Sequence, residues 1–148
     1  MGSRTSQAWP ARRLMLLLDS EAISAVAHGP AKRRDRVRAL VHQMRARDLP
    51  IATVASILAE VVRGRAADAA VFAGLRRERI EVHPVDSRVG VRAGQLLGRI
   101  GAGSAMAVDA FTVAVADLAG GAMIATVDPK DLKRLASHAT GVTIADIR

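Results

Sequence analysis

Four acidic residues of this chain lie within runs of apolar residues or directly after them. Asp19 and Asp128 each follow such a run, whereas Glu60 and Asp109 lie inside one. A carboxylate among buried neighbours costs free energy unless it is paired, hydrogen-bonded or bound to a metal ion. If the fold brings these four carboxylates together, the simplest explanation for them is a divalent-cation site that carries out hydrolysis.

Clustered carboxylates are the usual protein ligands of Mg²⁺ or Mn²⁺, which prefer oxygen donors. One or two such ions activate water and stabilise the charge that develops on a phosphodiester. Without a cation the carboxylates repel one another, which raises their pKa values. Other metal chemistry is disfavoured, because the chain has no cysteine and its four histidines show no zinc-ligand spacing.

Three of these acids also have a structural explanation. Asp19 and Asp128 stand where their side chains could cap a following helix. Pro129 and Asp131 strengthen the second cap pattern, since proline at the first helical position and an acid two residues later are typical of a helix start. The spacing leaves open whether Asp131 assists or replaces Asp128 at a metal site. Glu60 could face solvent or pair with a nearby arginine.

Asp109 is the hardest of the four acids to explain by structure alone. We expect it in the middle of a helix that is apolar from residue 108 to residue 116, where aspartate has poor helix propensity. Asp117, near the end of the same helix, is expected to be a surface acid. A functional role therefore explains Asp109 better than a structural one.

The elements that must position these acids alternate between strands and helices. The pattern predicts strands over residues 14–18, 51–54, 80–85, 122–127 and 142–145, and helices over 20–27, 32–47, 56–64, 66–77, 87–100, 107–118 and 129–138. Such alternation predicts a mostly parallel sheet covered on both faces, a three-layer α/β/α fold. Ligands of these sheets bind beyond the carboxyl ends of the strands, so Asp19 and Asp128 are expected at the same edge.

Length and composition predict one domain over residues 14–148, preceded by a flexible N-terminal extension over residues 1–13. No apolar stretch is long enough to cross a bilayer, and the N-terminus lacks the hydrophobic region of a signal peptide. Together with the absence of cysteine, this favours a cytoplasmic protein without membrane contact.

The chain is strongly basic, with a formal net charge of +8 and a pI of about 11.4. This favours polyanionic partners, nucleic acid first, or an acidic protein, although a GC-rich genome also enriches arginine. Basic residues gather in the expected helix over 32–47 and again at 76–79. They either steer a phosphate backbone towards the carboxylates or form a solvated helix face.

Four segments taken together resemble a PIN-domain ribonuclease, specifically the VapC toxins of VapBC toxin–antitoxin pairs. Residues 16–20 (Leu-Leu-Leu-Asp-Ser) are similar to the opening strand with the first acid of that family. Residues 53–64 and 108–116 look like the segments with its second and third acids. Residues 125–132, which contain Thr-x-Asp-x-x-Asp-Leu, resemble the segment with the fourth.

The resemblance implies a Mg²⁺- or Mn²⁺-dependent endoribonuclease that cleaves structured RNA such as tRNA or rRNA. It further implies a homodimer that is silenced by a VapB-type antitoxin. In this comparison Asp19, Glu60, Asp109 and Asp128 are metal ligands and catalytic residues, water is the nucleophile, and Thr126 orients the pocket. Many relatives carry one more acid where this chain has residues 104–107 (Ser-Ala-Met-Ala), so a second metal ion is expected to bind weakly or only with substrate.

Two further functions agree with the same residues. In the first, the protein is a non-catalytic nucleic-acid- or protein-binding domain whose acids cap helices and whose arginines bind the ligand. In the second, the same carboxylates serve a metal-dependent DNA nuclease, because nothing in the residues distinguishes ribose from deoxyribose substrates.

Overall fold

A computed structural model describes residues 14–148, so the predicted extension over residues 1–13 lies outside the described residues. The elements follow in the order β1 (Met15–Leu18), α1 (Ser20–His28), α2 (Ala31–Ala46), β2 (Ile51–Val54), α3 (Ala55–Val61), α4 (Asp68–Arg77), β3 (Glu81–His83), α5 (Ser87–Ile100), the 3₁₀ helix η1 (Ser104–Met106), α6 (Ala107–Leu118), β4 (Ala122–Thr126), α7 (Pro129–Ala136) and β5 (Val142–Asp146).

The five strands form one sheet in the order β3-β2-β1-β4-β5, and every neighbouring pair is parallel. Strand β1 is central, with Leu16 opposite Ile51 of β2 and Leu18 opposite Ala125 of β4. Because parallel strands end at the same side, the residues that follow β1 and β4 meet at one carboxyl edge.

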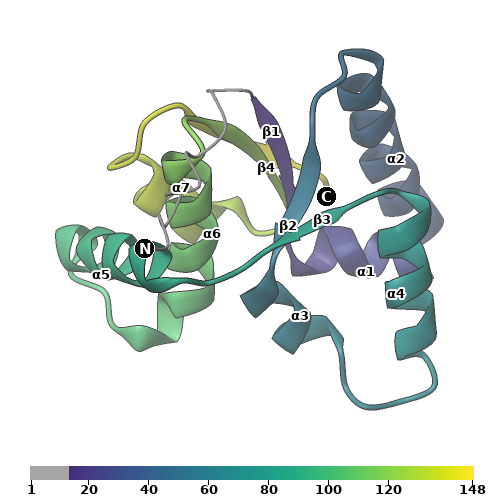
Figure 1. Cartoon of the computed structure of the whole chain (residues 1–148), viewed down its shortest axis with the longest axis horizontal. Helices are drawn as coiled ribbons and strands as arrows, with labels where there is room; N and C mark the ends of the chain where they lie inside the picture. Colours follow the sequence, from purple (N-terminus) through teal and green to yellow (C-terminus); the bar gives the residue numbers. More distant parts are fainter. Residues whose placement is uncertain (1–13) are drawn as a thin grey trace, which may run out of the picture.

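Helices cover both faces of this sheet, which confirms the predicted three-layer α/β/α fold (Figure 1). Helices α1, α2 and α4 pack together on one face, and α5, α6 and α7 pack together on the other. The short helix α3 contacts both α1 and α6. Within residues 14–148 no helix combines the length and the hydropathy that a membrane span requires.

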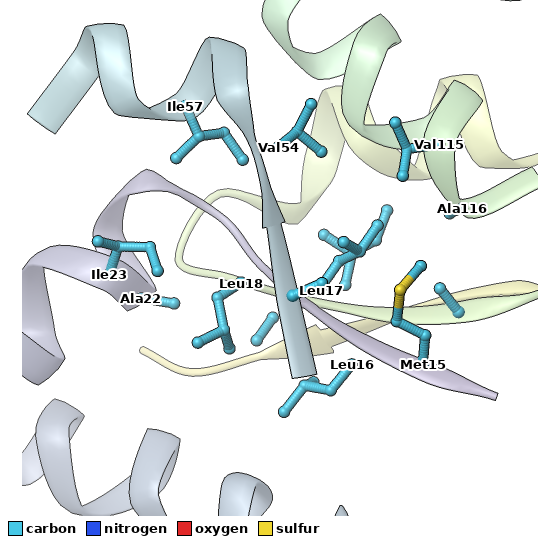
Figure 2. Packing of buried hydrophobic residues seen from close by; sticks show 14 of the residues in the cluster. Met15, Leu16, Leu17, Leu18, Ala22, Ile23, Val54, Ile57, Val115 and Ala116 are labelled. Carbon is cyan, nitrogen blue, oxygen red and sulfur yellow. The ribbon is translucent and has the colours of Figure 1, made fainter. Parts of the chain in front are cut away.

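The core is centred on β1 and is built almost entirely from aliphatic side chains. All four residues of β1 are buried, and they pack against side chains of β2, α1 and α6 (Figure 2). Helix α6 buries most of its surface between Ala110 and Ala116. Strand β1 can therefore end in a charged residue only at the rim of this core.

Local signals explain where several elements begin and end. Helix α5 has the predicted bounds, because the Asp86 side chain accepts a hydrogen bond from the Val89 amide at its start and Gly101 adopts a left-handed conformation at its end (φ 65°). Strand β3 is shorter than the predicted 80–85, since it lies between a turn at Arg79 (φ 47°) and Pro84. Helix α4 begins two residues later than predicted, after a loop folded around Asp68.

Candidate metal and active site

Asp19 stands at the carboxyl end of the central strand. Its amide donates a hydrogen bond to the Ala125 carbonyl (3.1 Å), which extends the pairing of β1 with β4 by one residue. Its carboxylate accepts a hydrogen bond from the Thr126 hydroxyl (3.0 Å), and that hydroxyl in turn accepts one from the Asp128 amide (3.1 Å). Thr126 thus links the ends of two adjacent strands and orients the Asp19 carboxylate.

The structural interpretation of Asp19 and Asp128 as capping side chains is not supported. Both residues occupy the N-cap position of a helix, α1 and α7 respectively, but neither side chain makes a capping hydrogen bond. Asp19 instead points its carboxylate at Thr126. Helix capping therefore does not explain these two acids.

Burial raises the pKa of Asp19 above its usual value. Hydrogen bonds from the Ser20 backbone and from Thr126 oppose this rise, while the negative charges of Glu21 and Asp128 add to it. Desolvation and neighbouring acids therefore make the ionised form of Asp19 less favourable than that of a solvated aspartate.

Asp109 lies in the first turn of α6, not in its middle as the sequence suggested. An acid in the first turn is favoured by the helix dipole, so poor helix propensity is a weaker argument at this position than we expected. The pKa of Asp109 is nevertheless raised to about 6, first by burial and then by the charges of Asp19, Asp131, Glu60 and Asp128. The favourable interaction of Asp109 with the helix dipole therefore does not offset the effects of burial and of the neighbouring acids on its pKa.

Glu60 lies on α3 and is exposed, which agrees with the alternative that it faces solvent. Partial desolvation and the charge of Asp19 raise its pKa, and the charge of Arg63 opposes this rise. The Arg63 guanidinium donates its hydrogen bonds to the carbonyls of Ala59 (2.6 Å) and Val62 (3.1 Å). Arg63 therefore moderates the charge of Glu60 from a distance, without a direct ion pair among the described residues.

The structure thus places Asp19, Glu60, Asp109 and Asp128, hereafter the edge acids, within electrostatic range of one another. They come from the end of β1, from α3, from α6 and from the β4–α7 junction.

Two further acids contribute to the electrostatics of the site: Glu21, which was not among the predicted site residues, and Asp131, whose role was left open. Glu21 raises the pKa of Asp19 and Glu60, and Asp131 raises that of Asp109. The sequence signal that could have identified these two acids is their spacing, because Glu21 follows Asp19 by two residues and Asp131 follows Asp128 by three.

The edge acids offer oxygen donors alone, which fits a hard divalent cation such as Mg²⁺. Within residues 14–148, however, no three Asp, Glu or His side chains stand close enough to form a ready ligand set. This is compatible with Mg²⁺, which usually keeps several water ligands and is coordinated directly by only one or two carboxylates. The best placed direct ligands are the two partly buried acids, Asp19 and Asp109. The assignment of all four as metal ligands stays a prediction.

Comparison with known proteins addresses the fold. No protein-family model and no curated protein matches the sequence. The structure is similar to a chain of the VapBC2 complex of Rickettsia felis, solved bound to a DNA fragment from its promoter, with a TM-score of 0.64 and 16% sequence identity. The match covers 90% of this chain and 100% of that chain. The architecture of residues 14–148 is therefore PIN-like.

Proposed function

We propose that this protein is a metal-dependent endoribonuclease and the toxin of a type II toxin–antitoxin pair. The observation that carries the proposal is the electrostatic coupling of the edge acids, which come from four separate segments of the chain. Burial and the charges of neighbouring acids raise the pKa values of Asp19, Glu60 and Asp109. A divalent cation would relieve this repulsion, and among the described residues none of the edge acids forms an ion pair with a basic side chain.

The edge acids divide into two groups by their surroundings. Asp19 and Asp109 are partly buried and would contact the cation directly, whereas Glu60 and Asp128 are exposed and would hold its water ligands or face substrate. When bound, Mg²⁺ or Mn²⁺ supplies an activated water and neutralises charge on the scissile phosphate. Thr126 keeps the Asp19 carboxylate in place through its 3.0 Å hydrogen bond, so it is a positioning residue.

The choice of RNA and of an antitoxin partner has separate support. The strongly basic composition suits a polyanionic substrate, since cations raise the rate and affinity of binding to phosphate backbones. The structurally similar complex of Rickettsia felis is by its description a VapBC2 assembly. We therefore propose structured RNA as the substrate, a VapB-type protein as the inhibitor, and a homodimer as the working form.

The proposal is tested by RNA cleavage with Asp19→Asn and Asp109→Asn variants in Mg²⁺. Each variant keeps the size of the side chain and removes one ligand charge, so we expect cleavage to fall by at least about 100-fold. Glu81→Gln is the matched control, because Glu81 is exposed on the edge strand β3, outside the edge acids and outside α2, and the same charge change there should leave cleavage intact.

Three results would redirect the assignment. Full cleavage by both edge-acid variants would remove these carboxylates from the mechanism. Cleavage of DNA in preference to RNA of the same sequence would establish a DNA nuclease. Tight nucleic-acid binding without any cleavage in Mg²⁺ or Mn²⁺ would establish a non-catalytic binding domain.

A further inference from the structure

Helix α2 carries most of the excess positive charge of the chain. Residues 31–47 contain seven lysine or arginine residues and one aspartate, an excess of six in a chain whose net charge is +8. Only Val37, Val41 and Met44 of this helix are buried, so nearly all of its charged side chains lie on the outer surface. The charge is therefore concentrated on one helix of one face of the molecule.

Most of these cations have no acidic partner. Among the described residues, no acid lies within 4.0 Å of six exposed cations, which we call the basic surface: Lys32, Arg36, Arg38 and Arg47 at α2, with Arg76 and Arg79 at the end of α4. Two acids lie close in sequence, Asp35 and Asp48, and both are exposed. They are too few to neutralise the basic surface.

Contacts between elements join the basic surface into one region. Arg45 near the end of α2 pairs with Glu78 at the end of α4 (3.5 Å), and Arg77 pairs with the same carboxylate (3.3 Å). The Glu78 carboxylate is thus already shared by two arginines. The Arg45–Glu78 pair brings the end of α2, which carries Arg47, close to the end of α4, which is followed by Arg79.

The opposite face of the sheet carries a smaller excess of positive charge, because helices α5, α6 and α7 together contain six lysine or arginine residues and three aspartates. There Arg88 pairs with Asp86, Arg92 with Asp117, and Arg134 with Asp131. Half of those six cations therefore have an acidic partner, whereas five of the seven cations of residues 31–47 have none among the described residues. Solvation alone would not explain why the excess gathers on one face.

An ion pair links the first turn of α2 to the segment that follows Asp19. Arg33, in the first turn of α2, pairs with Glu21 in the first turn of α1 (3.3 Å), and Glu21 follows Asp19 by two residues. From there the 16 residues of α2 extend for about 24 Å at 1.5 Å per residue. An extended polyanion could therefore run along α2 and still reach Asp19.

We infer that the outer face of α2, together with the end of α4, binds the phosphate backbone of a structured RNA and delivers it to the edge acids. The choice of RNA rests on the proposed function, whereas the surface itself rests on the unpaired cations. A protein partner is less favoured, because among the exposed large apolar side chains of the described residues none lies on α2 and only Phe72 lies on α4. Protein interfaces usually need such apolar anchors, whereas phosphate binding needs only cations.

The test compares the double variant Arg36→Ala/Arg38→Ala with the control Arg99→Ala/Lys133→Ala. The control removes the same charge from exposed positions of α5 and α7 on the other face. Alanine suits a helix, so all four substitutions should leave the fold intact, which circular dichroism and the melting temperature check. Binding of a structured RNA is measured by fluorescence anisotropy at several salt concentrations, with Asp109→Asn added to both variants and with EDTA present, so that no cleavage occurs.

We expect the plot of log Kd against log salt concentration to become less steep by about 1.5–2 units in the Arg36/Arg38 variant, and not to change in the control. In proteins with intact Asp109, KM for the structured RNA should rise with kcat unchanged, while cleavage of a dinucleotide should stay at the level of the unaltered protein. Equal salt dependence in the two variants would overturn the inference. Loss of binding to an acidic peptide without loss of RNA binding would also overturn it, in favour of a protein partner.

The two proposals fail in different ways. If the unaltered protein cleaves RNA but the Arg36/Arg38 variant binds it normally, the basic surface is wrong and the nuclease proposal stands. If RNA binds in a salt-dependent manner that needs Arg36 and Arg38 but is never cleaved, the nuclease proposal is wrong and the basic surface stands.

Discussion

The two acids of helix α6 have opposite surroundings, although they share one helix. Asp117, near its end, accepts a hydrogen bond from Arg92 Nε (2.6 Å) and another from the Thr140 amide (2.8 Å). Asp109, at its start, has a pKa that is raised by burial and by the charges of four other acids, and no ion pair with it is formed among the described residues. The first acid is therefore neutralised within the fold, whereas the second is the one that we propose to bind a cation. On this proposal, ion pairing separates the structural acid from the functional one better than burial does.

Asp117 also corrects the expectation of a surface acid. Its side chain is only 14% exposed, and the paired Arg92 side chain is 27% exposed. Arg92 further donates a hydrogen bond to the His138 carbonyl (2.9 Å), so this network ties α5 and α6 to the segment before β5. Asp117 therefore stabilises the fold far from the edge acids.

The sharpest test of this contrast is Asp117→Asn. Removing the charge would leave the Arg92 guanidinium unpaired in a partly buried position, so we expect the free energy of unfolding to fall by about 2 kcal/mol. This is below the usual value for a fully buried pair, because water still screens the interaction. Urea denaturation measures the change, with Asp35→Asn as the exposed control. A loss no larger than that of the control would mean that Asp117 is not structural.

The next test uses the raised pKa of Asp109, about 6. A cation binds the ionised carboxylate, which predominates at pH 7 and becomes the minor form at pH 5. We therefore expect Mg²⁺ affinity to fall about tenfold between pH 7 and pH 5. Titration calorimetry at both pH values measures this change. In Asp109→Asn the dependence on pH should shrink, and an unchanged dependence would assign it to another group.

The smallest expected effect is the stability of Asp109→Asn without divalent cations. The folded state raises the pKa of Asp109 from 3.8 to about 6, so its contribution to stability is fully present below pH 3.8 and is lost as the pH rises through 6. At pH 7 the asparagine variant should therefore be more stable, by about 1 kcal/mol after allowance for solvent screening. This corresponds to a rise in Tm of about 3 °C, measured by calorimetry in EDTA.

This gain should disappear at pH 3.5, where Asp109 of the unaltered protein is itself protonated. A variant that is less stable at both pH values would place Asp109 in the same structural class as Asp117, and the contrast between the two ends of α6 would be lost.

Much of the fold could be predicted because its signals are local. The bounds of α5 follow from Asp86 and Gly101, and the alternation of strands and helices predicts the parallel sheet. The shared edge of Asp19 and Asp128 also follows, since both come after strands that the rule for parallel sheets aligns. The Thr126 hydroxyl can link the Asp19 carboxylate to the Asp128 amide because β1 and β4 are neighbouring strands.

The errors concern interactions between residues distant in sequence. The partner of Asp117 lies 25 residues earlier on another helix, and no local pattern indicates it. The exposure of Glu60 was left open, because it depends on how α3 is placed against α1 and α6, which an apolar run does not report. Asp131 was considered only as a companion of Asp128, whereas in the structure its charge also reaches Asp109.

The central place of β1 has a consequence for the synthesis of this protein. Asp19 and its partner Thr126 are separated by 107 residues, and β1 pairs with a strand from the last fifth of the chain. A ribosome must therefore translate β4 before the carboxyl edge can assemble. Products that terminate before β4 would contain Asp19 without its partner Thr126, so a cell producing the proposed toxin would meet its activity only after β4 has been synthesised.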